Sequence, residues 1–136
     1  IDLAFHLGGV PRELSARRAG RLDWHPSGAV FAGSGVTERD VLFSYFAAWN
    51  GGGRWGVELT TRERRLILRP LEGLLEQVRG RFDLAPVELE AEPPGLKAGF
   101  LAQLAAFLGD GADPRLCTAA EALRHRAVVE EMLGYA

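Results

Sequence analysis

The chain has 136 residues, of which 47% are hydrophobic and 25% charged, and its net charge at pH 7 is −2. These values indicate one globular domain with a core of its own, and the charge gives no reason to expect a nucleic-acid or anionic-membrane partner. One cysteine excludes an internal disulfide, and three histidines without a Cys/His cluster argue against a zinc site. Because no apolar run reaches the length of a membrane span and no signal peptide opens the chain, we expect a cytoplasmic protein.

The first segment has the pattern of a helix that starts abruptly. Residues 1–7 favour one or two turns of buried helix, which Gly8-Gly9 ends. The chain begins with Ile1 and not with methionine, and the helical pattern starts without a capping residue. We therefore expect a piece of a longer protein.

Two strands follow this helix. Partial alternation predicts the first over residues 10–16, and small and β-branched residues predict the second over 28–36. Gly33 and Gly35 in the second strand indicate a bulge or a close backbone approach. The polar connection over 17–27 carries Trp24-His25-Pro26.

The centre of the sequence predicts three strands in a row, at residues 41–49, 54–60 and 64–69. Tight turns at 50–53 and 61–63 would join them into one sheet. The first of these strands has apolar side chains on both parities, which is typical of a central strand covered on both sides. They are Val41, Phe43, Tyr45 and Trp49 on one parity, and Leu42, Phe46 and Ala48 on the other.

Two further strands are predicted at residues 73–78 and 82–89. Pro86 interrupts the second, because proline cannot donate to the ladder, and this favours an edge position or a bulge. Residues 90–95 read Glu-Ala-Glu-Pro-Pro-Gly and form the clearest linker in the chain.

The period then changes from two residues to 3.6, which predicts two helices. The first has an apolar stripe and ends at Gly109. Thr118 and Glu121 form the capping box of the second, which ends near Gly134. The stripe consists of Leu96, Phe100, Leu101, Leu104, Phe107 and Leu108, and the inward residues of the last helix are Ala122, Val129, Met132 and Leu133.

Strands in sequence followed by long helices predict an α+β fold over residues 1–136 as a single domain. We expect a mostly antiparallel open sheet with helices on one face. Because the strand at 41–49 is apolar on both parities, the other face should be buried by a second copy of the chain or by another domain.

No catalytic motif is complete within these residues. Gly51-Gly52-Gly53 lies between two strands and so resembles a turn more than a phosphate-binding loop. Ser27 follows His25 closely, but no acid completes a hydrolytic arrangement. Cys117 precedes a helix start, and without a nearby histidine in the sequence we interpret it as a small buried thiol.

Asp2 and His6 share one helix face at a spacing of i, i+4. This pair is either an acid–base couple or, as the commoner alternative, a half-buried helical histidine with local hydrogen bonds.

A family resemblance bears on this choice. The opening Ile-Asp-Leu-Ala-Phe-His-Leu-Gly-Gly-Val-Pro (residues 1–11) resembles the helix that opens the C-terminal domain of the glucose–fructose oxidoreductase / inositol dehydrogenase (Gfo/Idh/MocA) family. That helix reads roughly Asp-x-x-x-His-x-x-Asp-x-Ala-x-x-Leu-x-Gly. With Asp2 as the trailing aspartate, Ala4, Leu7 and Gly9 fall on the pattern, whereas the other register would require an aspartate at position 9. The matching register implies that the catalytic histidine of the family lies before Ile1 and that His6 is an ordinary helix residue.

The resemblance continues along most of the chain. Residues 53–59 and 65–72 look like a bacterial subgroup of the family, and residues 99–109 and 116–123 look like its last two helices. It implies an oxidoreductase of two domains, of which this chain is the second. That domain binds a sugar-like or polyhydroxy substrate and forms dimers through its open sheet face. The first, a dinucleotide-binding Rossmann domain, would carry NAD or NADP, so we expect no cofactor to be bound by this chain alone.

The candidate substrate contacts are Trp24, His25, Arg54 and Trp55, since planar and hydrogen-bonding side chains suit sugar rings and acidic groups. Asp2 would lie near the missing catalytic histidine. The alternative for Trp55 is a core position, because it shares the apolar face of its predicted strand. The alternative function for the whole chain is a stand-alone, non-catalytic dimerising scaffold or binding module.

Overall fold

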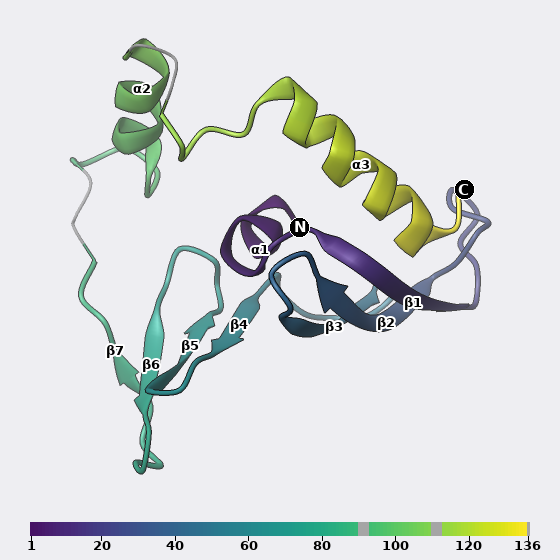
Figure 1. The fold of residues 1–136 in the computed structure, drawn as a ribbon, viewed down its shortest axis with the longest axis horizontal. Helices are drawn as coiled ribbons and strands as arrows, with labels where there is room; N and C mark the ends of the chain where they lie inside the picture. Colours follow the sequence, from purple (N-terminus) through teal and green to yellow (C-terminus); the bar gives the residue numbers. More distant parts are fainter. Residues whose placement is uncertain (90–92, 110–112, 136) are drawn as a thin grey trace. The chain divides into compact units, whose positions relative to one another are not determined.

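A computed structural model describes residues 1–89, 93–109 and 113–135. Within them the chain forms three helices and two antiparallel sheets, which confirms the predicted α+β class (Figure 1). The chain divides into two compact units, one formed by residues 1–53 with the segment from Cys117 onward, and the other by residues 54–116. Part of the predicted linker, residues 90–92, lies outside the described residues. None of the described helices is long and apolar enough to cross a membrane.

The first unit contains a three-stranded antiparallel sheet in the order β1-β2-β3. Helix α1 precedes the sheet in the chain, and helix α3 lies over β1 and β2 (Figure 1). The elements are α1 (Asp2–Gly8), β1 (Pro11–Ala19), β2 (Val30–Thr37), β3 (Leu42–Ala48) and α3 (Ala119–Leu133). Both predicted strands of the N-terminal part and the helix ends at Gly9, Thr118 and Gly134 are confirmed.

The core of this unit lies between the sheet and the two helices. Phe31 of β2, Met132 of α3 and Phe5 of α1 are buried. Helix α3 makes this contact with its C-terminal half, so Met132 lies inward as predicted, whereas Ala122 in the first turns of the helix is exposed.

Two glycines of β2 leave room on the strand for aromatic rings from β3. Gly33 lies opposite Tyr45, and Gly35 lies opposite Phe43. A methyl group at Gly33 would clash with the Tyr45 ring, and one at Gly35 would overlap the backbone carbonyl oxygen of Glu13. The pairing of β1 with β2 also shifts register between Pro11 and Glu13. The predicted close backbone approach is therefore confirmed.

The second unit contains a four-stranded antiparallel sheet in the order β4-β5-β6-β7, followed by one helix. Its elements are β4 (Val57–Thr60), β5 (Arg64–Leu68), β6 (Leu75–Val78), β7 (Ala85–Pro86) and α2 (Phe100–Leu108). The last strand is much shorter than the predicted 82–89, and Pro86 lies on the sheet edge, as expected of a residue without a backbone donor.

The structure differs from the expectation of one continuous central sheet. Strands β3 and β4 belong to different sheets, so residues 50–53 do not form a hairpin turn between paired strands. Three consecutive glycines have no side chains that could pack across a strand pair. Glycine also loses more conformational freedom than any other residue when it becomes ordered. Both effects disfavour the pairing of β3 with β4 through this segment.

Helix α2 also departs from expectation. The helix ends at Gly109 as predicted, but it begins at Phe100, so Leu96 of the apolar stripe precedes it. Phe100, Leu104 and Phe107 of the stripe are exposed. Ala106 is its one buried residue. Within the described residues the stripe therefore does not cover the sheet of the second unit.

Candidate functional site

The loop between β1 and β2 places a histidine at the centre of an aromatic cluster. Leu22 and His25 exchange backbone hydrogen bonds of 3.1 and 3.0 Å, which close the loop into a tight turn. This turn directs the His25 side chain inward, where only 5% of the residue remains exposed. The sequence predicted His25 as a candidate contact, and the structure makes it the best-packed polar residue of the loop.

Both ring nitrogens of His25 have partners. Nδ1 lies 2.8 Å from the Gly28 carbonyl oxygen. Because a carbonyl only accepts, Nδ1 carries the proton and Nε2 keeps its lone pair. The Tyr135 hydroxyl then donates to Nε2. His25 is in this way held in one orientation and one tautomer.

Tyr135 reaches His25 because of the way α3 ends. Gly134 adopts the left-handed conformation (φ 72°), and its N–H and that of Tyr135 donate to the last carbonyls of the helix. A side chain at Gly134 would overlap the Arg18 guanidinium, which itself donates to the Leu133 carbonyl at 3.2 Å. The turn brings the chain back toward the loop between β1 and β2.

Two tryptophans complete the cluster. The Trp24 and Trp49 rings are stacked, with centroids 5.5 Å apart and planes 7° apart. Trp49 also meets His25 edge-on at 4.6 Å. Trp24 remains 69% exposed, so one face of the stacked pair is open to solvent. We refer to Trp24, His25, Trp49 and Tyr135 as the aromatic platform.

Ser27 is close to His25 without forming a nucleophile–base pair. Its Oγ lies 3.3 Å from Nδ1 and 3.4 Å from Nε2, and therefore beside the ring. The lone pair on Nε2, which a general base would use, is already taken by Tyr135. The arrangement suits binding and positioning more than hydrolysis.

Asp2 lies in the same unit and pairs with a histidine that the sequence did not single out. Asp2 Oδ1 is 2.8 Å from Nδ1 of His125 on α3, and Phe5 packs edge-on against the His125 ring at 5.1 Å. The local pair considered from spacing, Asp2 with His6, is not formed, and His6 is exposed. The sequence carried no signal for the observed pair, because its partners meet only through packing of α1 on α3.

Cys117 is exposed and not buried as we predicted. Partial desolvation, followed by the charges of Asp2 and Glu121, raises the pKa of its thiol. A raised pKa lowers the thiolate fraction, so this position does not activate a nucleophile. Within the described residues, no group of three His, Cys, Asp or Glu side chains could hold a metal ion.

Arg54 and Trp55, the other predicted contacts, belong to the second unit. They precede β4 and lie outside any regular element. Trp55 is 70% exposed, so the alternative that placed it in the core is wrong. The apolar alternation of this strand begins only at Val57. The structure thus brings Trp24 and His25 together in one site and places Arg54 and Trp55 elsewhere in the chain.

Compared with models of known protein families and with curated protein sequences, the chain matches none.

Proposed function

We propose that this chain is the substrate-binding and dimerisation domain of an NAD(P)-dependent oxidoreductase that acts on a sugar-like or polyhydroxy substrate. The observation that carries the proposal is the exposed ring of Trp24, which is stacked on Trp49. A flat, exposed aromatic surface accepts the apolar C–H face of a sugar ring.

Each member of the aromatic platform has a distinct role in this proposal. Trp24 contacts the ring of the substrate, and Trp49 holds Trp24 in place. His25 is too deeply buried to meet the substrate and acts as a positioning residue, because it orients Tyr135 and packs on Trp49. Arg54 and Trp55 belong to the second unit and have no role in the aromatic platform.

We expect no dinucleotide cofactor to be bound by the chain itself. Its run of three glycines, residues 51–53, leads from β3 toward β4 and so does not open a helix that would hold a pyrophosphate. NAD or NADP would be held by an N-terminal dinucleotide-binding domain of the parent protein, and we derive no step of the reaction from the residues present here.

The open face of the first sheet is the proposed dimer surface. Leu42 and Phe46 of β3 are 80% and 73% exposed on the face away from α3. The face continues on β2, where Val36 lies opposite Leu42 and Ala32 lies opposite Phe46. An exposed apolar patch of this kind marks an interaction surface.

A second copy of the chain fits this face because its residues are arranged in complementary rows. Ser15, Ser34 and Ser44 lie opposite one another and form a central row. Arg17 lies on one side of this row and Glu13 on the other. A two-fold axis along the serine row would place Arg17 of each copy over Glu13 of the other, and Phe46 over Leu42.

Calorimetric titration of the chain with glucose, gluconate and myo-inositol tests the substrate proposal, since these probes are a neutral sugar, an acidic sugar and a cyclic polyol. We expect at least one to bind, and W24A to weaken binding about tenfold, or roughly 1.4 kcal/mol. F82A, which removes another exposed aromatic ring from the second unit, is the matched control and should bind like wild type. Equal binding by W24A and wild type would overturn the proposal.

The exposed sheet face also favours a second candidate, a non-catalytic dimerising scaffold. A scaffold of this kind would dimerise through the same surface but would bind no substrate. Dimerisation of a chain that binds none of the three probes would favour this candidate.

A further inference from the structure

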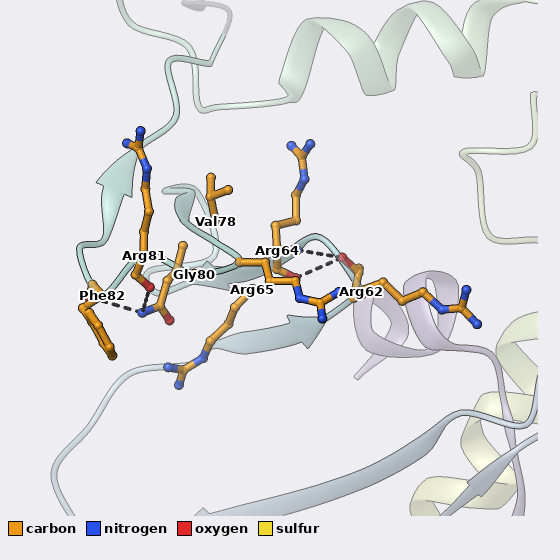
Figure 2. Close-up of a pocket in the computed structure, with 10 residues that line it drawn as sticks. Arg62, Arg64, Arg65, Val78, Gly80, Arg81 and Phe82 are labelled. Atoms are coloured by element: carbon orange, nitrogen blue, oxygen red, sulfur yellow. Dashed lines mark hydrogen bonds between the residues drawn. The ribbon is translucent and has the colours of Figure 1, made fainter.

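The start of β5 and the end of β6, opposite the loop that joins these two strands, carry a hollow of about 400 Å³ lined by arginines (Figure 2). Two segments that are separate in the sequence form it, one before β5 and one after β6. The Arg79 N–H donates to the Glu63 carbonyl at 2.8 Å and joins them. The arginines are Arg62, Arg64, Arg65, Arg79 and Arg81, and none of the residues that line the hollow is acidic.

Side-chain hydrogen bonds hold both turns in shape. Thr61 Oγ1 accepts from the N–H groups of Glu63 and Arg64 and donates to the Arg64 carbonyl. Gln77 Nε2 donates to the carbonyls of Arg81 and Phe82 at 3.1 and 3.2 Å. The backbone that carries the arginines is therefore ordered before any ligand binds, which lowers the entropic cost of binding.

The arginines divide into paired and unpaired groups. Arg64 forms an ion pair with Glu76 at 2.8 Å, and Arg65 binds both carboxylate oxygens of Glu58. Within the part of the chain that the structure describes, Arg62, Arg79 and Arg81 have no carboxylate partner. Three guanidinium groups thus remain available to an anion.

The available groups do not converge on one point. Figure 2 shows Arg62 and Arg81 extending from the sheet in different directions. Gly80, next to Arg81 in the chain, adds no side chain there. A single compact anion cannot meet both, whereas anionic groups spaced along a chain can. Phe82, beside Arg81, is 99% exposed and offers a free aromatic face.

We infer that this hollow binds single-stranded nucleic acid, with the phosphates on Arg62, Arg79 and Arg81 and a base stacked on Phe82. Arginine forks bind phosphate oxygens in pairs, and an exposed aromatic ring stacks on any base. The net charge of −2 led us to expect no nucleic-acid partner, but net charge averages over the chain and does not describe this local group. The inference concerns the second unit and is independent of the aromatic platform.

Fluorescence anisotropy with a fluorescein-labelled oligothymidine of about twelve nucleotides tests the inference. We expect binding that weakens with salt between about 50 and 200 mM. R79A/R81A should weaken binding about tenfold and lower the log–log salt slope by roughly 1.4, since each phosphate contact on a single strand contributes about 0.7. F82A should weaken binding about fivefold or more.

W24A is the matched control and should bind the oligonucleotide like wild type, while F82A leaves sugar binding unchanged. The two proposals can thus fail separately. Equal binding by wild type and R79A/R81A would overturn the inference. Competition by poly-glutamate as strong as by unlabelled oligonucleotide would overturn it in favour of an acidic protein segment, and equal competition by ATP in favour of a free nucleotide.

Discussion

Asp2 of α1 and His125 of α3 are separated by 123 positions in the sequence, and a hydrogen bond of 2.8 Å joins their side chains. The His125 side chain is mostly buried, and Asp2 is largely exposed. With Phe5 packed against the imidazole, this pair holds the short helix α1 against the middle of α3. An isolated helix of seven residues is not stable in water, so α1 depends on these contacts.

Replacement of the carboxylate should therefore loosen α1. We expect D2A to lower the free energy of unfolding by about 0.5–1 kcal/mol, a small value because Asp2 is exposed to solvent. D2N retains an acceptor oxygen and should lose less. Amide hydrogen exchange of α1, compared between the two variants, measures the effect; unchanged protection in D2A would show that the pair contributes nothing.

The glycines of β2 give a second prediction. In G35A the new methyl group would overlap the Glu13 carbonyl and touch the Phe43 ring, so we expect a loss of roughly 3 kcal/mol. Gly52, which has no atoms within 4 Å of such a methyl group, provides the control variant G52A. Urea denaturation of both variants checks the difference, and equal stabilities would mean that β1 and β2 pack less closely than described.

The capping box of α3 predicts a dependence on pH. The Thr118 backbone N–H and then its hydroxyl donate to Glu121 and lower the pKa of that carboxyl from its ordinary value of 4.5. Because the folded pKa is the lower one, the contribution is complete above pH 4.5 and is lost as the pH falls through the folded value. The stability difference between wild type and E121Q should shrink over this range. A difference that stays constant as the pH falls well below 4.5 would contradict the prediction.

The proposed dimer predicts the effects of both apolar and charged substitutions. L42E/F46E should be monomeric in light scattering at concentrations at which wild type is dimeric. L123E, which places the same charge on the exposed outer side of α3, should remain dimeric.

The complementary rows give a sharper test of the same interface. E13R and R17E should each weaken the dimer, because each places like charges over one another. The double variant E13R/R17E restores opposite charges and should recover most of the affinity. If the double variant instead lost the sum of the affinities that the two single variants lose, the two-fold axis along the serine row would be excluded.

The orientation of Tyr135 yields a final prediction. Y135F leaves Nε2 of His25 buried without its donor and should lower the free energy of unfolding by about 1 kcal/mol. A change in tryptophan emission should accompany the loss, since Trp49 packs on the His25 ring. Y45F, which removes a hydroxyl that has no partner in the described structure, is the control and should cost less.

The local structure of the chain could be predicted from the sequence. Gly9, the Thr118–Glu121 capping box and Gly134 end or begin helices where they were predicted, because helix termini depend on backbone groups within one turn. The strands of both sheets were also predicted, since alternation is a local pattern. The α+β class followed from the order of these elements.

The contacts between distant residues, in contrast, could be found only in the fold. Tyr135 on His25, His125 on Asp2 and Arg79 beside Glu63 are contacts across the chain, which packing selects from many that the sequence would allow. The alternation of apolar and polar residues likewise did not show that the strands divide into two sheets at Gly53. Strand pairing depends on packing across the pair and not on either strand alone. The same reason explains why the sequence identified Trp24 and His25 as single candidates, while the platform that joins them to Trp49 and Tyr135 appeared only in the fold.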